Sequence, residues 1–189
     1  MINENMINEN MLNENMINEN IINEIEQYSI KISAEHYFEP AGIHGIEHTK
    51  RVLLLSAILA DLNALSLTEK DILYHAAVYH DIGRTCNGID HSHGLKSWRK
   101  VKDLGILAER NEEFEQILKY VITNHSISDV EVKEFIGSCE NIRVKLLFEL
   151  LKDSDGLDRV RLGDLDVNYL RNGHSKGLVE VARSIYKKD

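Results

Sequence analysis

The sequence predicts an all-α protein, and three observations favour this fold class. Only one proline, Pro40, occurs in 189 residues, so little in the chain interrupts helices. Leu, Ile, Glu and Lys, which favour helices, are frequent. Apolar residues recur at helical spacing from Ile21 onward, whereas no run alternates with period two for long enough to form a convincing strand. A chain of this length is expected to form one domain with a sizeable core.

The first twenty residues form a repeat. The sequence Met-Ile-Asn-Glu-Asn begins at residues 1, 6, 11 and 16 with little change. A period of five rotates the apolar pair by about 140° per repeat on a helix, so no continuous apolar stripe forms. We interpret residues 1–20 as a low-complexity extension without a part in the chemistry, followed by one domain over 21–189. An oligomerising tail is the alternative interpretation.

The remaining elements are expected in chain order. One helical stripe consists of Ile21, Ile25, Tyr28 and Ile32. This helix is expected to end near Pro40, because proline disfavours its continuation. Thr68, with Asp71 three residues on, resembles a capping box, and Asn87-Gly88 indicates a loop over 83–93. Further helices are predicted at 45–62, 68–82, 94–103, 112–125, 129–136, 141–157 and 177–187.

Residue types that bind metals stand at the ends of apolar helical stripes. His48 begins such a stripe, and His80, His125 and Asp155 end others. The four stripes contain Val52, Leu55 and Leu59; Leu73, Ala76 and Ala77; Phe114, Ile117, Leu118, Val121 and Ile122; and Val144, Leu147, Phe148 and Leu151. A helix face of this width normally faces the core. Because a buried carboxylate is costly unless it is paired or bound to metal, four helices that aim such residues inward predict a shared ion.

The order of these residues resembles a known signature. His48, the string HDIGR at 80–84 and the string DSDGLDRVR at 153–161 resemble the H…HD…D pattern of the HD-domain superfamily of metal-dependent phosphohydrolases. The resemblance covers about residues 36–172. His93-Gly94 and Asn124-His125 extend it toward members that hold two metals, which include the YqeK-like dinucleoside polyphosphate hydrolases and the HD-GYP cyclic dinucleotide phosphodiesterases. The GYP tripeptide is absent here, which weakens the cyclic dinucleotide interpretation.

The resemblance implies a role for each matching residue. His48, His80, Asp81 and Asp155 would hold one metal, and Asp81 would bridge to a second metal. The second metal would be held by His93 and His125. Such a site implies one or two divalent transition-metal ions per chain, with Mn, Fe, Co and Zn all compatible with His and Asp ligands. Two cations roughly 3.5 to 4 Å apart can generate hydroxide and stabilise an in-line displacement at phosphorus, with Asp81 as the catalytic bridge.

Other charged residues near the motifs are candidates for substrate binding or support. Arg84 closes the HDIGR string, where it would hold phosphate oxygens as a catalytic and substrate-binding residue; a surface salt bridge is the alternative. His44 and Arg51 flank His48 and are further substrate-binding candidates, although Arg51 could instead pair with a carboxylate. Asp158 is a candidate to orient a ligand histidine. Asp153 lies about 200° from Asp155 around a helix and is expected to point away from the site.

The functional hypothesis is a metal-dependent phosphohydrolase. It would cleave a phosphate ester or anhydride of a small molecule, with a nucleotide or dinucleotide as the expected substrate. A di-iron oxygenase is the first alternative, because some relatives in the superfamily use the same six ligands for oxygen chemistry. A metal-holding or nucleotide-binding sensor module without catalysis is the second. Substrate choice depends on pocket shape, which the ligand motif does not specify.

Composition limits the partners and the location. Residues 1–27 contain six glutamates and no basic residue, so taking these from the net charge of −9 leaves −3 for residues 28–189. A small phosphorylated substrate fits this balance, whereas a nucleic-acid polymer does not. The longest apolar run, 52–60, is too short to span a membrane, and no secretory signal is recognisable. Cys86 and Cys139 are isolated, as in a cytoplasmic protein with reduced thiols. Homo-oligomerisation stays open.

Deletion of residues 1–20 is expected to leave the activity within about twofold of the full chain, because the repeat makes no patterned contact. The measurement is the rate of the truncated and the full-length protein under the same metal loading. A collapse of activity in a folded truncated protein would contradict the interpretation of the repeat.

Overall fold

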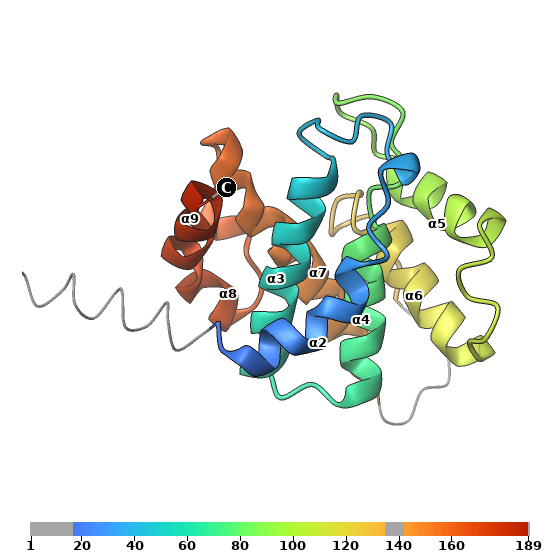
Figure 1. The fold of residues 1–189 in the computed structure, drawn as a ribbon, viewed down its shortest axis with the longest axis horizontal. Helices are drawn as coiled ribbons and strands as arrows, with labels where there is room; N and C mark the ends of the chain where they lie inside the picture. The colour runs from blue at the N-terminus through green and yellow to red at the C-terminus, as the bar shows by residue number, and fades with distance from the viewer. Residues whose placement is uncertain (1–16, 135–141, 189) are drawn as a thin grey trace, which may run out of the picture.

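The computed structural model describes residues 17–134 and 142–188. Within these ranges the chain forms eight α-helices and no strand, which confirms the predicted all-α class (Figure 1). The helices are α2 (Glu19–Ser29), α3 (Ile46–Leu62), α4 (Leu67–Tyr79), α5 (His93–Asp103), α6 (Glu112–Asn124), α7 (Val144–Leu157), α8 (Gly173–Gly177) and α9 (Val179–Lys188). Three short 3₁₀ segments complete the described part: η1 (Ala34–His36), η2 (Asp158–Leu162) and η3 (Val167–Tyr169).

Helix α3 is the centre of the bundle. It packs against α2, α4 and α7 and also touches α8, α9 and η2. Figure 1 shows α5 and α6 on one side of it and α8 and α9 on the other. Its side chains from Val52 to Ala60 are buried apart from the half-buried Leu54. A helix that is apolar on nearly every face has to lie inside the protein, and α3 therefore supplies a rigid support for the residues at its N-terminal end.

The first helix is shorter than the apolar stripe predicts. It begins at Glu19, where the Asn18 side chain accepts a hydrogen bond from the Ile21 amide at 3.1 Å, so the folded part includes the last residues of the predicted extension. It ends at Ser29 instead of continuing toward Pro40. No glycine or proline marks this end in the sequence. The spacing of the apolar residues therefore predicts a longer helix than the one that forms.

The start of α4 also differs from the prediction. The capping box consists of Ser66 and Glu69, not of Thr68 and Asp71. The Ser66 hydroxyl accepts from the Glu69 amide at 3.3 Å, and the Glu69 carboxylate accepts from the Ser66 amide at 2.8 Å. Asp71 lies further inside the helix and accepts from Arg110. Glutamate is the usual residue at the third helical position of this motif, because its side chain is longer than that of aspartate and reaches back to the N-cap amide.

One predicted helix is not formed in the described residues. Positions 129–134 are turns and irregular backbone, and the remaining positions of the predicted 129–136 helix lie outside the described ranges. Asp129 instead accepts hydrogen bonds from Lys152 and Arg171, which fix the segment to α7 and to the tail. The loop over 83–92 and the starts and ends of α5, α6, α7 and α9 lie within three residues of the prediction.

The described helices give no membrane-spanning candidate, since none is both long and apolar enough. Cys86 is an exposed free thiol, and Cys139 lies outside the described residues. Trp98 is buried in the core.

An ion pair between the buried Glu69 and the exposed Arg143 joins the starts of α4 and α7. The Glu69 carboxylate accepts from Arg143 Nε at 2.9 Å, from Nη2 at 2.8 Å and from the Arg143 amide at 3.0 Å. The same guanidinium donates to the carbonyls of Asn63 and Ala64 at the end of α3. The hydrogen bonds from Arg143 outweigh burial and lower the pKa of Glu69 from its usual 4.5 to about 2. Three helix ends are therefore held at one point.

Replacement of this carboxylate, Glu69→Gln, is expected to lower the free energy of unfolding at pH 7 by about 1–3 kcal/mol, because Arg143 loses its charged acceptor. A depressed folded-state pKa supplies stability above the unfolded value, and this stability is lost as the pH falls. The difference between wild type and variant should therefore shrink between pH 4.5 and about 2. Urea unfolding at several pH values measures it.

The matched control is Glu47→Gln, which removes an exposed ion pair with Lys50 at the start of α3. Exposed pairs contribute little, so this variant should unfold like the wild type. Equal effects of the two substitutions at pH 7 would contradict the role of Glu69.

Candidate metal centre

Five helix ends converge on one point of the bundle. His48 lies in the first turn of α3, and His80 and Asp81 directly follow α4. His93 is the first residue of α5, and His125 directly follows α6. Asp155 lies in the last turn of α7. The structure thus brings together all six residues that the sequence predicts as metal ligands. Two groups of three among them, and a third group that includes His44, are spaced closely enough to hold an ion.

One group of ligand atoms surrounds the Nε2 atom of His48. This atom lies 3.2 Å from His80 Nε2, 3.4 Å from Asp155 Oδ1 and 3.6 Å from Asp81 Oδ2. The two histidines are fully buried, whereas the Asp155 side chain is 35% exposed. Solvent and ligands therefore reach this group from the Asp155 side.

A second group surrounds the other oxygen of Asp81. Asp81 Oδ1 lies 3.0 Å from His93 Nε2 and 3.5 Å from His125 Nε2, and the two imidazole nitrogens are 2.8 Å apart. Asp81 therefore faces the first group with Oδ2 and the second with Oδ1. A carboxylate in this position can bridge two ions, whereas an imidazole can bind only one through each nitrogen.

The four histidines share one orientation. In each, Nδ1 faces an oxygen that has no proton to give, so Nδ1 carries the proton and Nε2 keeps its lone pair. The contacts are His48 with Asp158 Oδ2 at 2.7 Å, His80 with the Ala77 carbonyl at 2.9 Å, His93 with the Asp90 carbonyl at 2.5 Å and His125 with the Ile122 carbonyl at 2.6 Å. All four Nε2 lone pairs consequently point into the cluster, the arrangement typical of metal-bound histidines.

The pKa shifts of His80 and Asp81 suit a cation. At His48, hydrogen bonds to Asp158 and Asp81 outweigh burial and raise the pKa, so a metal ion competes with a proton there. Burial lowers the pKa of His80 to about 3, so this imidazole is neutral at neutral pH. Burial favours the protonated form of Asp81, but the groups that hydrogen-bond to it, His44 among them, outweigh burial and hold the pKa of Asp81 well below its usual value. Among the described residues, no hydrogen-bond donor satisfies the buried Oδ1 of Asp81. Neutral nitrogens and ionised carboxylates are the forms that bind metals, so the donor set fits one or two divalent ions.

Two glycines allow the helices to approach closely enough to form the cluster. Gly83, the last residue of the HDIG string, donates its amide to Ser97 Oγ at 2.9 Å, and a Cβ at this position would overlap the Ser97 backbone. A Cβ at Gly94 would similarly crowd the Ile122 carbonyl of α6. These contacts place His93 beside the residues that follow α4 and α6.

A buried carboxylate behind His48 fixes its orientation. Asp158 accepts from His48 Nδ1, from Arg51 Nε at 2.6 Å and from Arg161 Nη1 at 2.9 Å. Burial works against its charge, but His48 and the Arg51 guanidinium lower the pKa of Asp158 below its usual value. This is the geometry expected of Asp158 from the sequence. Asp153 points away from the cluster, also as expected, and accepts from the Arg171 amide and guanidinium.

Of the three candidates for substrate binding, two lie at the mouth of the cluster and one is buried behind it. His44 Nδ1 and Arg84 Nε reach Asp81 Oδ2 at 2.9 and 2.8 Å, and both side chains are partly exposed at the mouth of the cluster. Arg51 is buried on the Nδ1 side of His48, where its guanidinium pairs with Asp158, the alternative that the sequence left open. Arg161 was not among the candidates, although its position three residues after Asp158 is a recognisable ion-pair spacing.

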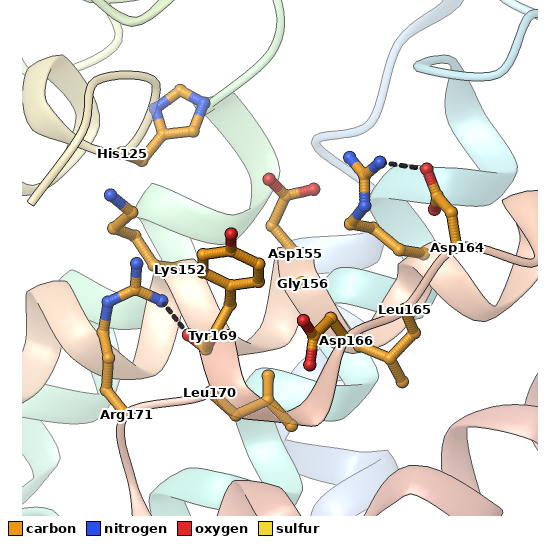
Figure 2. A pocket seen from close by; sticks show the side chains of 11 residues that line it. His125, Lys152, Asp155, Gly156, Asp164, Leu165, Asp166, Tyr169, Leu170 and Arg171 are labelled. Atoms are coloured by element: carbon orange, nitrogen blue, oxygen red, sulfur yellow. Dashed lines mark hydrogen bonds and ion pairs between the residues drawn. The ribbon is translucent and has the colours of Figure 1, made fainter.

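Two cavities open beside the cluster. The first has a volume of about 360 Å³ and is lined by His125, Lys152, Asp155, Arg159, Tyr169 and Arg171, among others (Figure 2). The second, also about 360 Å³, is lined by His44, Arg84, His93 and Arg159 and by an apolar rim. Sequence reasoning did not identify Arg159 or Tyr169, because the tail that carries them has no periodic pattern.

The family follows from a comparison with protein-family models. The model described as HD domain matches residues 45–162, which is more than half of the chain and includes all six cluster residues. The chain belongs to the HD domain family. Neither curated proteins nor solved structures gave a significant match. Membership of the HD family indicates metal-dependent hydrolase-type activity in general, and the cluster is where the metal would bind.

Substitution of the bridging carboxylate, Asp81→Ala, is expected to abolish stoichiometric metal binding, because both groups of imidazoles lose their shared anionic ligand. Elemental analysis of protein purified without chelator or nickel affinity resin measures the metal content. The His93→Ala variant should retain the ion held by His48, and any ion that it loses should be the one held by His93 and His125. Exposed Asp61 on α3 provides the control, and Asp61→Ala should keep the wild-type content. Wild-type metal content in Asp81→Ala would refute the bridging assignment.

Proposed function

We propose that this HD domain is a metal-dependent phosphohydrolase that cleaves a phosphate ester or anhydride of a small molecule. The observation that carries the proposal is the position of Asp81. Its two oxygens face two separate groups of imidazole lone pairs, at 3.6 Å from His48 Nε2 on one side and 3.0 Å from His93 Nε2 on the other. This arrangement supports a site for two adjacent divalent ions.

In this proposal the cluster residues divide into two sets. His48, His80, Asp81 and Asp155 hold one ion, and His93 and His125 share Asp81 to hold the other. The ions would be manganese, iron, cobalt or zinc, which accept mixed nitrogen and oxygen ligands. Bound at such a site, two divalent ions lower the pKa of water and neutralise the charge on phosphoryl oxygens.

The charges around the cluster favour an anionic substrate. The negative charge of Asp158 is offset by Arg51 and Arg161, so it does not add to the two cluster carboxylates. Two divalent ions would carry more positive charge than Asp81 and Asp155 carry negative charge, and the Arg84 guanidinium adds a further positive charge at the mouth. When substrate binds, Arg84 would release Asp81 and donate to the phosphate instead. Its planar guanidinium can donate two parallel hydrogen bonds to two phosphate oxygens.

We propose a nucleotide as the substrate class, on the resemblance of the six-residue pattern to two-metal members of the superfamily. An exposed tyrosine, Tyr169, beside Asp155 supports this class because it offers an aromatic face close to the cluster. Arg84 and His44 supply donors for the phosphate on the other side.

The test is phosphate release by protein stripped of metal and reloaded with manganese, cobalt, zinc or iron in separate samples. Nucleoside phosphates and p-nitrophenyl phosphates are suitable substrates. Arg84→Ala should lower kcat/KM by about 100-fold without a change in metal content, because it removes a donor to the phosphate. Arg99→Ala, which removes an exposed arginine on the outer face of α5, is the control and should behave as wild type.

No turnover of any phosphate compound by the metal-loaded protein would refute the proposal. Oxygen consumption by the iron-loaded protein, without phosphate release, would move the assignment to the di-iron oxygenase alternative.

A further inference from the structure

We propose that Lys31 is a site of covalent acylation and that its acyl donor is a small acyl phosphate. The amine belongs to a row of three side chains, Asp71, His75 and Lys31, that ends at a cavity. This cavity has a volume of about 500 Å³ and lies among the end of α2, the middle of α4 and the segment that joins α5 to α6. It shares no lining residue with the two cavities beside the metal cluster, so the site does not depend on the proposed phosphohydrolase activity.

His75 lies inside the bundle and is oriented by Asp71. Its side chain is 2% exposed, and its Nδ1 faces two oxygens of Asp71, the carbonyl at 2.8 Å and the carboxylate Oδ1 at 3.0 Å. Burial works against the charge of this carboxylate, but His75 and Tyr28 donate to it and lower the pKa of Asp71 to about 2. Because neither oxygen has a proton to give, Nδ1 carries the proton and Nε2 keeps a lone pair.

The lone pair of His75 faces the amine of Lys31. Nζ lies 3.2 Å from His75 Nε2 and 5.1 Å from the centre of the Tyr28 ring. Within the described ranges this half-buried amine forms no ion pair with a carboxylate. Burial lowers the pKa of Lys31, and the guanidinium of Arg110 lowers it further. A lysine that is partly removed from water, lies near a second cation and contacts a base is an activated nucleophile.

The lining of the cavity favours a small anionic acyl donor. The Arg110 side chain is 34% exposed and donates to Asp71 through Nη1 and Nη2, which leaves further N–H groups for a phosphate. Glu109 is the carboxylate among the lining residues, and it is exposed. Ile106 and Ala108 offer apolar surface for a short acyl chain. An acyl phosphate combines the two parts that this lining accommodates, a short acyl group and an anionic leaving group.

The acylation step balances without a further reactant. The neutral amine of Lys31 attacks the carbonyl carbon of the donor, a bond forms between Nζ and this carbon, and the bond from the carbon to the bridging phosphate oxygen breaks. Phosphate leaves with the electron pair, and the surplus proton on Nζ passes to His75 Nε2, which returns it to solvent. The product is an amide whose N–H can still donate to His75. Acylation therefore removes the charge of Lys31 and keeps its hydrogen bond.

The first experiment treats the full-length protein with limiting acetyl phosphate at pH 7 and follows each lysine by peptide mass spectrometry. Lys145 is the reference, because its side chain is 88% exposed. Lys31 is expected to react at least about fivefold faster than Lys145, although it is the less exposed of the two. An equal or slower reaction of Lys31 would overturn the proposal.

The pH dependence of the same reaction separates reactivity from access. The charged and titratable groups around the amine are Tyr28 of α2, Asp71 and His75 of α4, and Glu109 and Arg110 before α6. Because the pKa of Lys31 is lowered, its neutral form appears at lower pH, and its rate should reach half of the maximum at a lower pH than the rate of Lys145. Coincident profiles would contradict the assignment of Lys31 as an activated amine.

A substitution of the base tests the row of side chains. His75→Gln should lower the rate of Lys31 with acetyl phosphate to about that of Lys145, because the amide oxygen can accept a hydrogen bond but cannot take a proton. Circular dichroism reports whether the variant is folded, and the pH profile of the wild type carries the test if it is not. A wild-type rate of Lys31 in folded His75→Gln would show that the imidazole is not the base and would overturn the proposed step.

A second substitution tests the class of donor. Arg110→Gln should reduce the rate of Lys31 with acetyl phosphate at least about threefold more than its rate with uncharged N-hydroxysuccinimidyl acetate, because only the first reagent carries a phosphate. The matched control is Arg99→Gln, which removes an exposed arginine of α5 and should change neither rate. An equal loss with both reagents in Arg110→Gln would overturn the assignment to acyl phosphates.

Discussion

The carboxylate of Asp81 lies in the interior between two pairs of imidazoles whose protons all point away from it. His48 and His80 on one side, and His93 and His125 on the other, direct unprotonated nitrogens toward its oxygens. Arg84 donates to Oδ2 from the mouth, but among the described residues no donor satisfies the buried Oδ1. Lone pairs and negative charge concentrated in this way are unfavourable in a protein interior unless a further cation compensates them. The convergence of five helix ends, the glycines that let them approach and the buried core of α3 all serve to hold this arrangement.

A second layer of contacts makes the orientation of the imidazoles independent of the metal. Three of the four histidines donate Nδ1 to a backbone carbonyl three residues earlier in the chain, so the local turn sets the ring. His48 lies inside a helix whose carbonyls are already used, and it depends on the side chain of Asp158 instead. Arg51 and Arg161 stabilise that carboxylate in turn. Preorganised ligands lose little entropy on binding, which favours a tightly held ion.

The cluster and the residues around it have different origins in the chain. The cluster comes from the ends of α3 to α7, within the range that defines the HD family. Arg159 and Tyr169, which separate and line the cavities, come from the short segments η2 and η3 that follow α7. A rigid bundle thus carries the general chemistry, while a tail without long helices shapes the space beside it. This division agrees with a family in which one ligand pattern serves many substrates.

The sequence by itself determined the all-α class and the inward position of His48, His80, His125 and Asp155, because apolar periodicity reports which side of each helix is buried. A polar ligand at the end of such a stripe must then lie inside the protein. The resemblance to the HD signature added Asp81, His93 and the support from Asp158. The capping box of Ser66 and Glu69 has the usual local spacing, and the sequence analysis placed it two residues too late. Only the tertiary structure decided that α2 ends at Ser29 and that residues 129–134 are not helical. It also placed Arg51 behind His48 and brought Arg159 and Tyr169 to the cavities. These outcomes depend on contacts between residues far apart in the chain, and no local spacing encodes such contacts.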